Sequence, residues 1–126
     1  MMVSTIPMPP QTTFSALVGW VIANERARLG LTQAALASKM ELPQSSWSRL
    51  ESGQTLLTVD QLDRVAHHLQ ITAHEIMNRA EQLRATLTNQ GVQVNAGARQ
   101  TGKNAENFLW GAALGALVTA LLLGRN

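Results

Sequence analysis

The sequence contains no cysteine, so a disulfide framework and a thiolate metal site are both excluded. Its length of 126 residues leaves room for one domain with appendages. Two full domains do not fit, because a stable core usually takes roughly 60 residues or more. The chain also lacks a basic segment followed by an apolar run at its start, so residues 1–13 do not predict a secretory signal.

The first two thirds of the chain have a net charge of zero. Within residues 1–87, seven Arg and Lys residues are matched by seven Asp and Glu residues. The basic surplus lies in the tail, where Arg99, Lys103 and Arg125 face only Glu106. A protein that binds nucleic acid mainly by phosphate attraction normally has a basic domain. Binding driven by overall charge is therefore not expected.

No group of residues typical of catalysis or metal binding occurs. The only imidazoles are His67, His68 and His74, and they lack both a cysteine partner and the HExxH spacing. A Ser, His and acid arrangement and a glycine-rich phosphate loop are also absent. We therefore expect neither an enzyme nor a metal or cofactor site, and we expect the histidines at the surface or at helix ends.

Helical periodicity dominates residues 14–87, and no segment alternates as a strand does. Apolar residues at helical spacing begin at Phe14, and Gly30 favours a helix end. Thr58 with Gln61, and Thr72 with Glu75, have the capping-box spacing. The predicted helices cover residues 14–29, 33–40, 43–52, 59–69 and 73–87.

Two segments flank this helical region. Residues 1–13 contain three prolines and no charge, which predicts a flexible arm. Residues 88–107 are rich in Asn, Gln and Gly, which predicts a flexible linker spanning about 25 Å. The domain itself is expected over residues 14–87.

The stretch "LGLTQAALASKMELPQSSWSRLESG", Leu29 to Gly53, resembles the Cro/repressor (XRE) helix-turn-helix family. The resemblance covers roughly residues 14–80. It implies an all-α fold, a five-helix Cro/repressor-like helix-turn-helix bundle. In that geometry one short helix braces against the sugar-phosphate backbone while the next enters the major groove.

The resemblance also implies roles for individual residues. Gln33 matches a glutamine that contacts the backbone and supports the recognition helix. Four residues match the positions that face the groove: Gln44, Ser45, Ser48 and Arg49. Glutamine can pair with adenine, and arginine with guanine. Phosphate contacts are expected from Arg28 and Lys39.

Other matched positions concern the scaffold. Arg26 and Glu51 match a pair that joins the first helix to the end of the third, and we assign both a structural role. Glu41 stands where the family commonly has Gly, at a turn that favours a left-handed backbone. Pro43 stands where the family commonly has a capping Ser or Thr, and it supplies no capping oxygen.

Residues 108–124 carry no charge and would form about 25 Å of helix. Gly111, Gly115 and Thr119 form one ridge of small residues, as membrane helix packing requires. "ENFLWGAALGALVTALLLGRN" also resembles the tail anchors of the ElaB/YqjD inner-membrane proteins. We therefore predict a separate C-terminal transmembrane-type helix, with the bundle facing a bacterial cytoplasm. The alternative is self-association of this segment in a soluble cytoplasmic oligomer.

Two functions follow from these features. The first is a sequence-specific, dimeric DNA-binding transcriptional regulator of the XRE type, tethered to a membrane. The alternative is a membrane-anchored scaffold, similar to the RodZ family, that binds a protein partner. Trp20 lies off the apolar stripe of its helix, so either the N-terminal arm covers it or it contacts a second copy or a partner.

Overall fold

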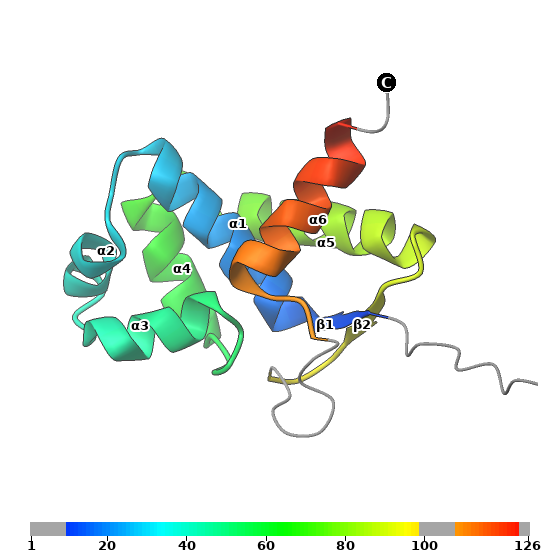
Figure 1. Cartoon of the computed structure of the whole chain (residues 1–126). Helices are drawn as coiled ribbons and strands as arrows, with labels where there is room; N and C mark the ends of the chain where they lie inside the picture. The colour runs from blue at the N-terminus through cyan, green and yellow to red at the C-terminus, as the bar shows by residue number, and fades with distance from the viewer. Residues whose placement is uncertain (1–9, 99–107, 124–126) are drawn as a thin grey trace, which may run out of the picture.

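The structure is a computed structural model that describes residues 10–98 and 108–123. Within these ranges the chain forms six helices and two short strands. In chain order they are β1 (Gln11–Thr13), α1 (Phe14–Arg28), α2 (Gln33–Lys39), α3 (Gln44–Glu51), α4 (Val59–His68), α5 (Ala73–Asn89), β2 (Gln93–Asn95) and α6 (Gly111–Leu123). Figure 1 shows α2 and α3 at one end of the molecule, and α6 beside α1 and α5 at the other.

Helices α1 to α5 confirm the predicted bundle, although α5 runs two residues beyond its predicted end. Threonine hydroxyls begin four of them by accepting a backbone N–H three residues ahead, which satisfies a donor that the first turn leaves free. These threonines are Thr13, Thr32, Thr58 and Thr72. Thr58 and Gln61 form a complete capping box. The core behind the helices includes Leu17, Leu36, Trp47, Val65 and Ile76, all fully buried.

The two strands correct the predictions for the arm and the linker. β1 and β2 pair in parallel, with Thr12 opposite Val94. Thr12 and Thr13 are fully buried, so the last residues of the predicted arm belong to the core. β2 and the end of α5 lie inside the predicted linker. A strand of three residues is too short to show alternation, and its pairing partner is distant in sequence, so periodicity could not reveal it. Residues 1–9 and 99–107 lie outside the described residues.

Strand β1 also holds the start of the C-terminal segment. Phe108 pairs with Gln11 on the side of β1 away from β2. The Leu109 amide donates to the Gln11 carbonyl at 2.7 Å, and the Thr12 hydroxyl donates to the Leu109 carbonyl at 2.6 Å. Phe108 is itself buried. The chain therefore enters α6 from a fixed point on the bundle.

Helix α6 packs on the bundle, which corrects the prediction of a separate transmembrane-type helix over residues 108–124. Leu114 and Val118, one helical turn apart, are buried in the common core. α6 has 13 residues, about 20 Å of helix, whereas a hydrocarbon core is about 30 Å thick. In the part of the chain that the structure describes, no helix is both long enough and apolar enough to cross a membrane.

The small residues of α6 do not act together as one ridge. A Cβ added at Gly115 would lie 3.2 Å from Nε1 of Trp20, so Gly115 lets α6 approach α1 closely. Gly111 begins the helix with a φ of +53° and no atom near its missing Cβ, and Thr119 is exposed. Trp20 is half-buried. Trp20 contacts α6, a neighbour that the sequence analysis did not name, and residues 1–9 of the predicted arm lie outside the described residues.

Candidate nucleic-acid interface

The turn between α2 and α3 has the closed geometry that the sequence predicts. The Leu42 amide donates to the Ala37 carbonyl and the Glu41 amide to the Ser38 carbonyl, both at 3.0 Å. These two bonds form a Schellman motif, whose central residue is usually glycine. Glu41 takes that position with a φ of +61°, so the expectation of a left-handed backbone there is confirmed. Pro43 precedes α3 and makes no side-chain capping bond, also as predicted.

The inner face of α3 is fixed by a buried carboxylate. Glu51 Oε2 accepts a bond from Nε1 of Trp47 at 2.7 Å and one from Nε of Arg26 at 2.8 Å. Glu51 Oε1 accepts from Arg26 Nη2 at 3.1 Å and from Gln33 Nε2 at 3.0 Å. We call these four residues the Glu51 network. It joins α1, α2 and α3, so the orientation of α3 is set by directional bonds as well as by packing.

The network brings together three residues that the sequence singled out for different reasons. Arg26 and Glu51 form the expected ion pair, and the Glu51 side chain keeps 6% of its surface exposed. Gln33 uses its amide N–H on the same carboxylate, which supports α3 from the preceding helix. Trp47 is the fourth member of the network, and the sequence analysis assigned it no role. Its indole bond to Glu51 was missed, because nothing in the sequence pairs an indole with a carboxylate one turn later.

Gly19 is a further positioning residue that the sequence analysis did not identify. A Cβ at this position would lie 2.1 Å from the backbone oxygen of Glu51, so only glycine lets α1 meet the end of α3. An isolated glycine inside an apolar helical pattern costs about 1 kcal/mol relative to alanine. A glycine kept at this cost indicates close packing against another backbone, so the sequence could have predicted a close contact at Gly19.

The outer face of α3 presents the residues expected to face a groove. Gln44, Ser45 and Arg49 are exposed, and Ser48 is half-buried. Their spacing of one, four and five residues places them on one side of the helix. Arg49 donates to the Ser46 hydroxyl at 3.4 Å, which is long for a hydrogen bond. Lys39 is exposed in the last turn of α2.

Arg28 is placed differently from the other candidates. It donates to Glu25 on the same helix at 3.0 Å, and Arg79 of α5 reaches the same carboxylate at 2.9 Å. The hydrogen bonds from Arg28 lower the pKa of Glu25, against the burial that raises it, and Arg79 adds to the lowering. Arg28 thus takes part in an ion-pair cluster that joins α1 to α5, with 57% of its side chain exposed.

The histidines lie at helix ends. His67 and His68 are in the last turn of α4, and His74 is in the first turn of α5. Across residues 10–98 and 108–123, no three His, Cys, Asp or Glu side chains are grouped so that they could hold a metal ion.

Comparisons with known proteins agree with this geometry. Residues 17–77 match the family described as a helix-turn-helix domain. A curated relative, the cryptic phage CTXphi transcriptional repressor RstR of Vibrio cholerae serotype O1, is 33% identical over 58 residues, which are 46% of this chain and 52% of that protein. The chain therefore spans about half the length of this relative.

Solved structures show the same fold. The clp gene regulator ClgR from Corynebacterium glutamicum aligns with a TM-score of 0.59 at 23% identity, over 61% of this chain and 82% of that one. A mutant of the restriction-modification controller protein C.Esp1396I aligns with a TM-score of 0.50 at 25% identity, over 55% of this chain and 92% of that one. The observed turn with its two short helices and these matches together show a helix-turn-helix fold, and residues 17–77 are the part that matches the helix-turn-helix domain model.

Proposed function

We propose that this chain is a sequence-specific DNA-binding transcriptional regulator whose helix α3 reads the major groove. The observation that carries the proposal is the contrast between the two faces of α3. Its inner face is fixed by the Glu51 network, while its outer face keeps polar side chains exposed. A rigid helix with an exposed polar face suits recognition, because base readout requires side chains that are held where they can hydrogen-bond with the base edges in the major groove. The similarity to a phage transcriptional repressor supports the same function.

The exposed residues suggest a division of roles. Arg49 is proposed to pair with a guanine, Gln44 with an adenine, and Ser45 and Ser48 with neighbouring base edges. Lys39 is proposed to contact a phosphate. Arg28 is a weaker phosphate ligand in this proposal, because a phosphate would compete with Glu25 for its guanidinium.

The neutral domain predicts how binding depends on salt. Few Lys and Arg residues are available to neutralise phosphates, so few counterions are released on binding. Affinity should then depend on base contacts more than in a basic domain. A dimer would place two copies of α3 about 34 Å apart, over a palindromic site.

The test is a gel shift of the full chain on genomic fragments, with Arg49→Ala as the variant. Losing one bidentate base contact should weaken binding to the selected site by about 1–3 kcal/mol and relax the base preference at one position. Arg84→Ala is the matched control, because Arg84 is another exposed arginine and lies on α5, outside α2 and α3. It should leave the base preference unchanged.

The opposite outcome would be equally clear. If no sequence-specific complex forms with any genomic fragment, the regulator proposal fails. Co-purification of a stoichiometric protein partner without DNA would instead indicate the scaffold function.

A further inference from the structure

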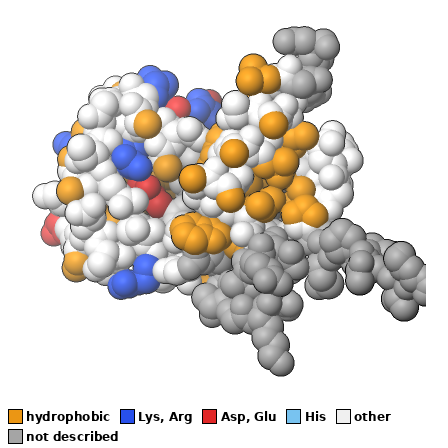
Figure 2. Space-filling model, in the orientation of Figure 1, with side chains coloured by type: hydrophobic (Ala, Val, Ile, Leu, Met, Phe, Trp, Pro, Cys, Tyr) orange, Lys and Arg blue, Asp and Glu red, His pale blue; other side chains and the backbone are white. Residues whose placement is uncertain are grey.

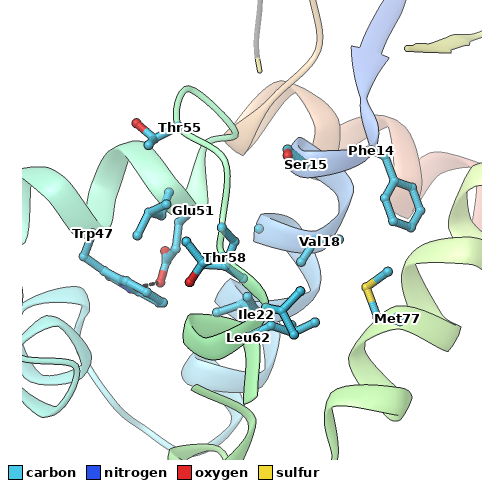
Figure 3. A pocket seen from close by; sticks show the side chains of 14 residues that line it. Phe14, Ser15, Val18, Ile22, Trp47, Glu51, Thr55, Thr58, Leu62 and Met77 are labelled. Carbon is cyan, nitrogen blue, oxygen red and sulfur yellow. Dashed lines mark hydrogen bonds between the residues drawn. The ribbon is translucent and has the colours of Figure 1, made fainter. Parts of the chain in front are cut away.

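A cavity of about 200 Å³ lies behind α3, between α1, α4 and the segment that joins α3 to α4. Figure 3 shows the residues that line it, which come from these elements and from α5. Its apolar wall is formed by Phe14, Val18, Ile22, Trp47, Leu62 and Met77. Thr55 and Val59 also line the cavity and are exposed, so its mouth opens at the segment between α3 and α4.

We propose that this space, called here the α3 cavity, binds a small uncharged aromatic molecule. The proposal goes beyond DNA binding, since it assigns a ligand site to the opposite side of the recognition helix. Its three supports are the size of the cavity, the charge of its lining and the chemistry of its wall.

The size fits one or two fused rings. An apolar protein cavity of about 150 Å³ stays dry and accepts benzene, so about 200 Å³ is enough for benzene or indole. Pockets for drug-sized ligands are larger, about 300–1,000 Å³. The ligand class is therefore limited to molecules of roughly six to ten heavy atoms.

The charge of the lining selects an uncharged ligand. Glu51 is the one ionisable residue among those that line the cavity. Both of its carboxylate oxygens are already bound, by Arg26, Gln33 and Trp47. An anion would meet a negative carboxylate, and a cation would have to displace Arg26 from it. Either ligand would lose its hydration without gaining a free partner.

The wall favours a flat ring over an aliphatic chain. Phe14 and Trp47 offer ring edges and faces, and the Met77 sulfur makes favourable contacts with aromatic rings. Ser15 and Thr55 add two hydroxyl groups to the lining, and an indole N–H could donate to one of them. A ligand in this place would press against Trp47, whose indole holds Glu51 and so helps to set the position of α3.

The test is a titration of the full chain with indole, and separately with benzene, in the absence of DNA. The three tryptophan indole N–H resonances are followed by ¹H–¹⁵N NMR, and a Trp47→Phe variant identifies the Trp47 signal. We expect a saturable shift of the Trp47 resonance, with smaller shifts for Trp20 and Trp110.

Two variants fill the cavity from different positions, Ser15→Leu at its half-buried rim and Val18→Phe on its buried wall. Each should weaken indole binding by about tenfold or more. Thr86→Leu is the matched control, because Thr86 is a half-buried threonine lining a separate groove between α1, α5 and α6. It should bind indole as the unaltered chain does. If Val18→Phe fails to fold, as judged by circular dichroism, Ser15→Leu carries the test.

Two results would overturn the proposal. One is the lack of a saturable Trp47 shift up to the solubility limit of both probes. The other is unchanged indole affinity in a folded Ser15→Leu variant. Because the titration contains no DNA, a chain that binds indole but forms no DNA complex would refute only the regulator proposal. Any effect of the ligand on DNA affinity rests on that proposed function.

Discussion

The bundle of α1 to α5 and the described part of the C-terminal extension, residues 93–98 and 108–123, are held in place by different interactions. In the bundle, buried carboxylates bind specific partners, as Glu51 binds Arg26 and as Glu25 binds Arg28 and Arg79. In the described part of the extension, the hydrogen bonds to β1 involve backbone groups and the uncharged side chains of Thr12, Asn95 and Gln11, and α6 adds apolar contacts. In α6, Leu114 and Val118 are buried and Leu117 and Leu121 pack against the same core, while Leu122 and Leu123 remain exposed.

The difference shows what each region depends on. Charge-assisted hydrogen bonds are directional, so they fix the angle at which α3 stands on α1. Apolar burial is non-directional and depends on area, so it holds α6 without specifying its angle as tightly. The surfaces of the two regions differ as well. In Figure 2, hydrophobic side chains gather over α6 and its neighbours, while charged side chains occur mainly on the helix-turn-helix side.

The largest effect is expected from Glu51→Ala in the bundle. Removing the carboxylate leaves Arg26 largely buried without its counter-charge and also removes the acceptor for Trp47. Breaking a buried pair in this way costs about 3–5 kcal/mol of unfolding free energy. Urea unfolding measures it, with Glu41→Ala as the control, since Glu41 is 83% exposed and its partner Arg64 is 3.4 Å away. Similar small losses in both variants would show that the Glu51 network does not stabilise the bundle.

Much of the bundle could be predicted from sequence because its signals are local. The predicted caps Thr58 and Thr72, and the Gln61 of the capping box, lie within three residues of the groups that they satisfy, whereas Thr13 was placed in the arm. The resemblance to the XRE family supplied the rest, including the pair of Arg26 with Glu51. The Trp47 bond and the close approach at Gly19 were not predicted, because both depend on how two helices meet.

The extension could not be predicted in this way because its partners are distant in sequence. Gln11 binds residues on both of its sides that lie more than eighty positions later. The uncharged composition of α6 fits a membrane helix and a helix packed on a bundle equally well. Only the buried positions Leu114 and Val118, and the contact between Gly115 and Trp20, distinguish the two.

The second prediction tests whether the extension and the bundle unfold together. Leu114 is fully buried, so Leu114→Ala should cost about 2–3 kcal/mol, in the lower part of the usual range because most of α6 is exposed and can relax. Leu122→Ala, at a position that is 57% exposed, should cost far less. The measurement is thermal unfolding of the full chain followed by circular dichroism. A helix that unfolds separately would leave the main transition unchanged in both variants.

The third prediction concerns acid, and its effect should be smaller. The hydrogen bonds from Arg28 lower the pKa of Glu25 below 4.5, so the folded chain binds a proton there less readily than the unfolded chain. The resulting stability is present above pH 4.5 and is lost as the pH falls through the lower pKa of the folded state. Glu25→Gln should therefore reduce the loss of unfolding free energy on acidification. Glu81→Gln, at an exposed residue that is 3.6 Å from Arg84, should not, and equal acid sensitivity in all three proteins would contradict the prediction.

The smallest effects are expected at two left-handed residues, one in each region. Glu41 has a φ of +61°, so Glu41→Gly relieves backbone strain but makes the unfolded chain more flexible, with a net gain of up to about 1 kcal/mol. Gly111 has a φ of +53° with open space at its missing Cβ, so Gly111→Ala adds strain without a clash and should cost about 1 kcal/mol. Urea unfolding of the two variants should give changes of opposite sign. If Gly111→Ala also stabilises the chain, Gly111 does not have a left-handed backbone and α6 starts in another conformation.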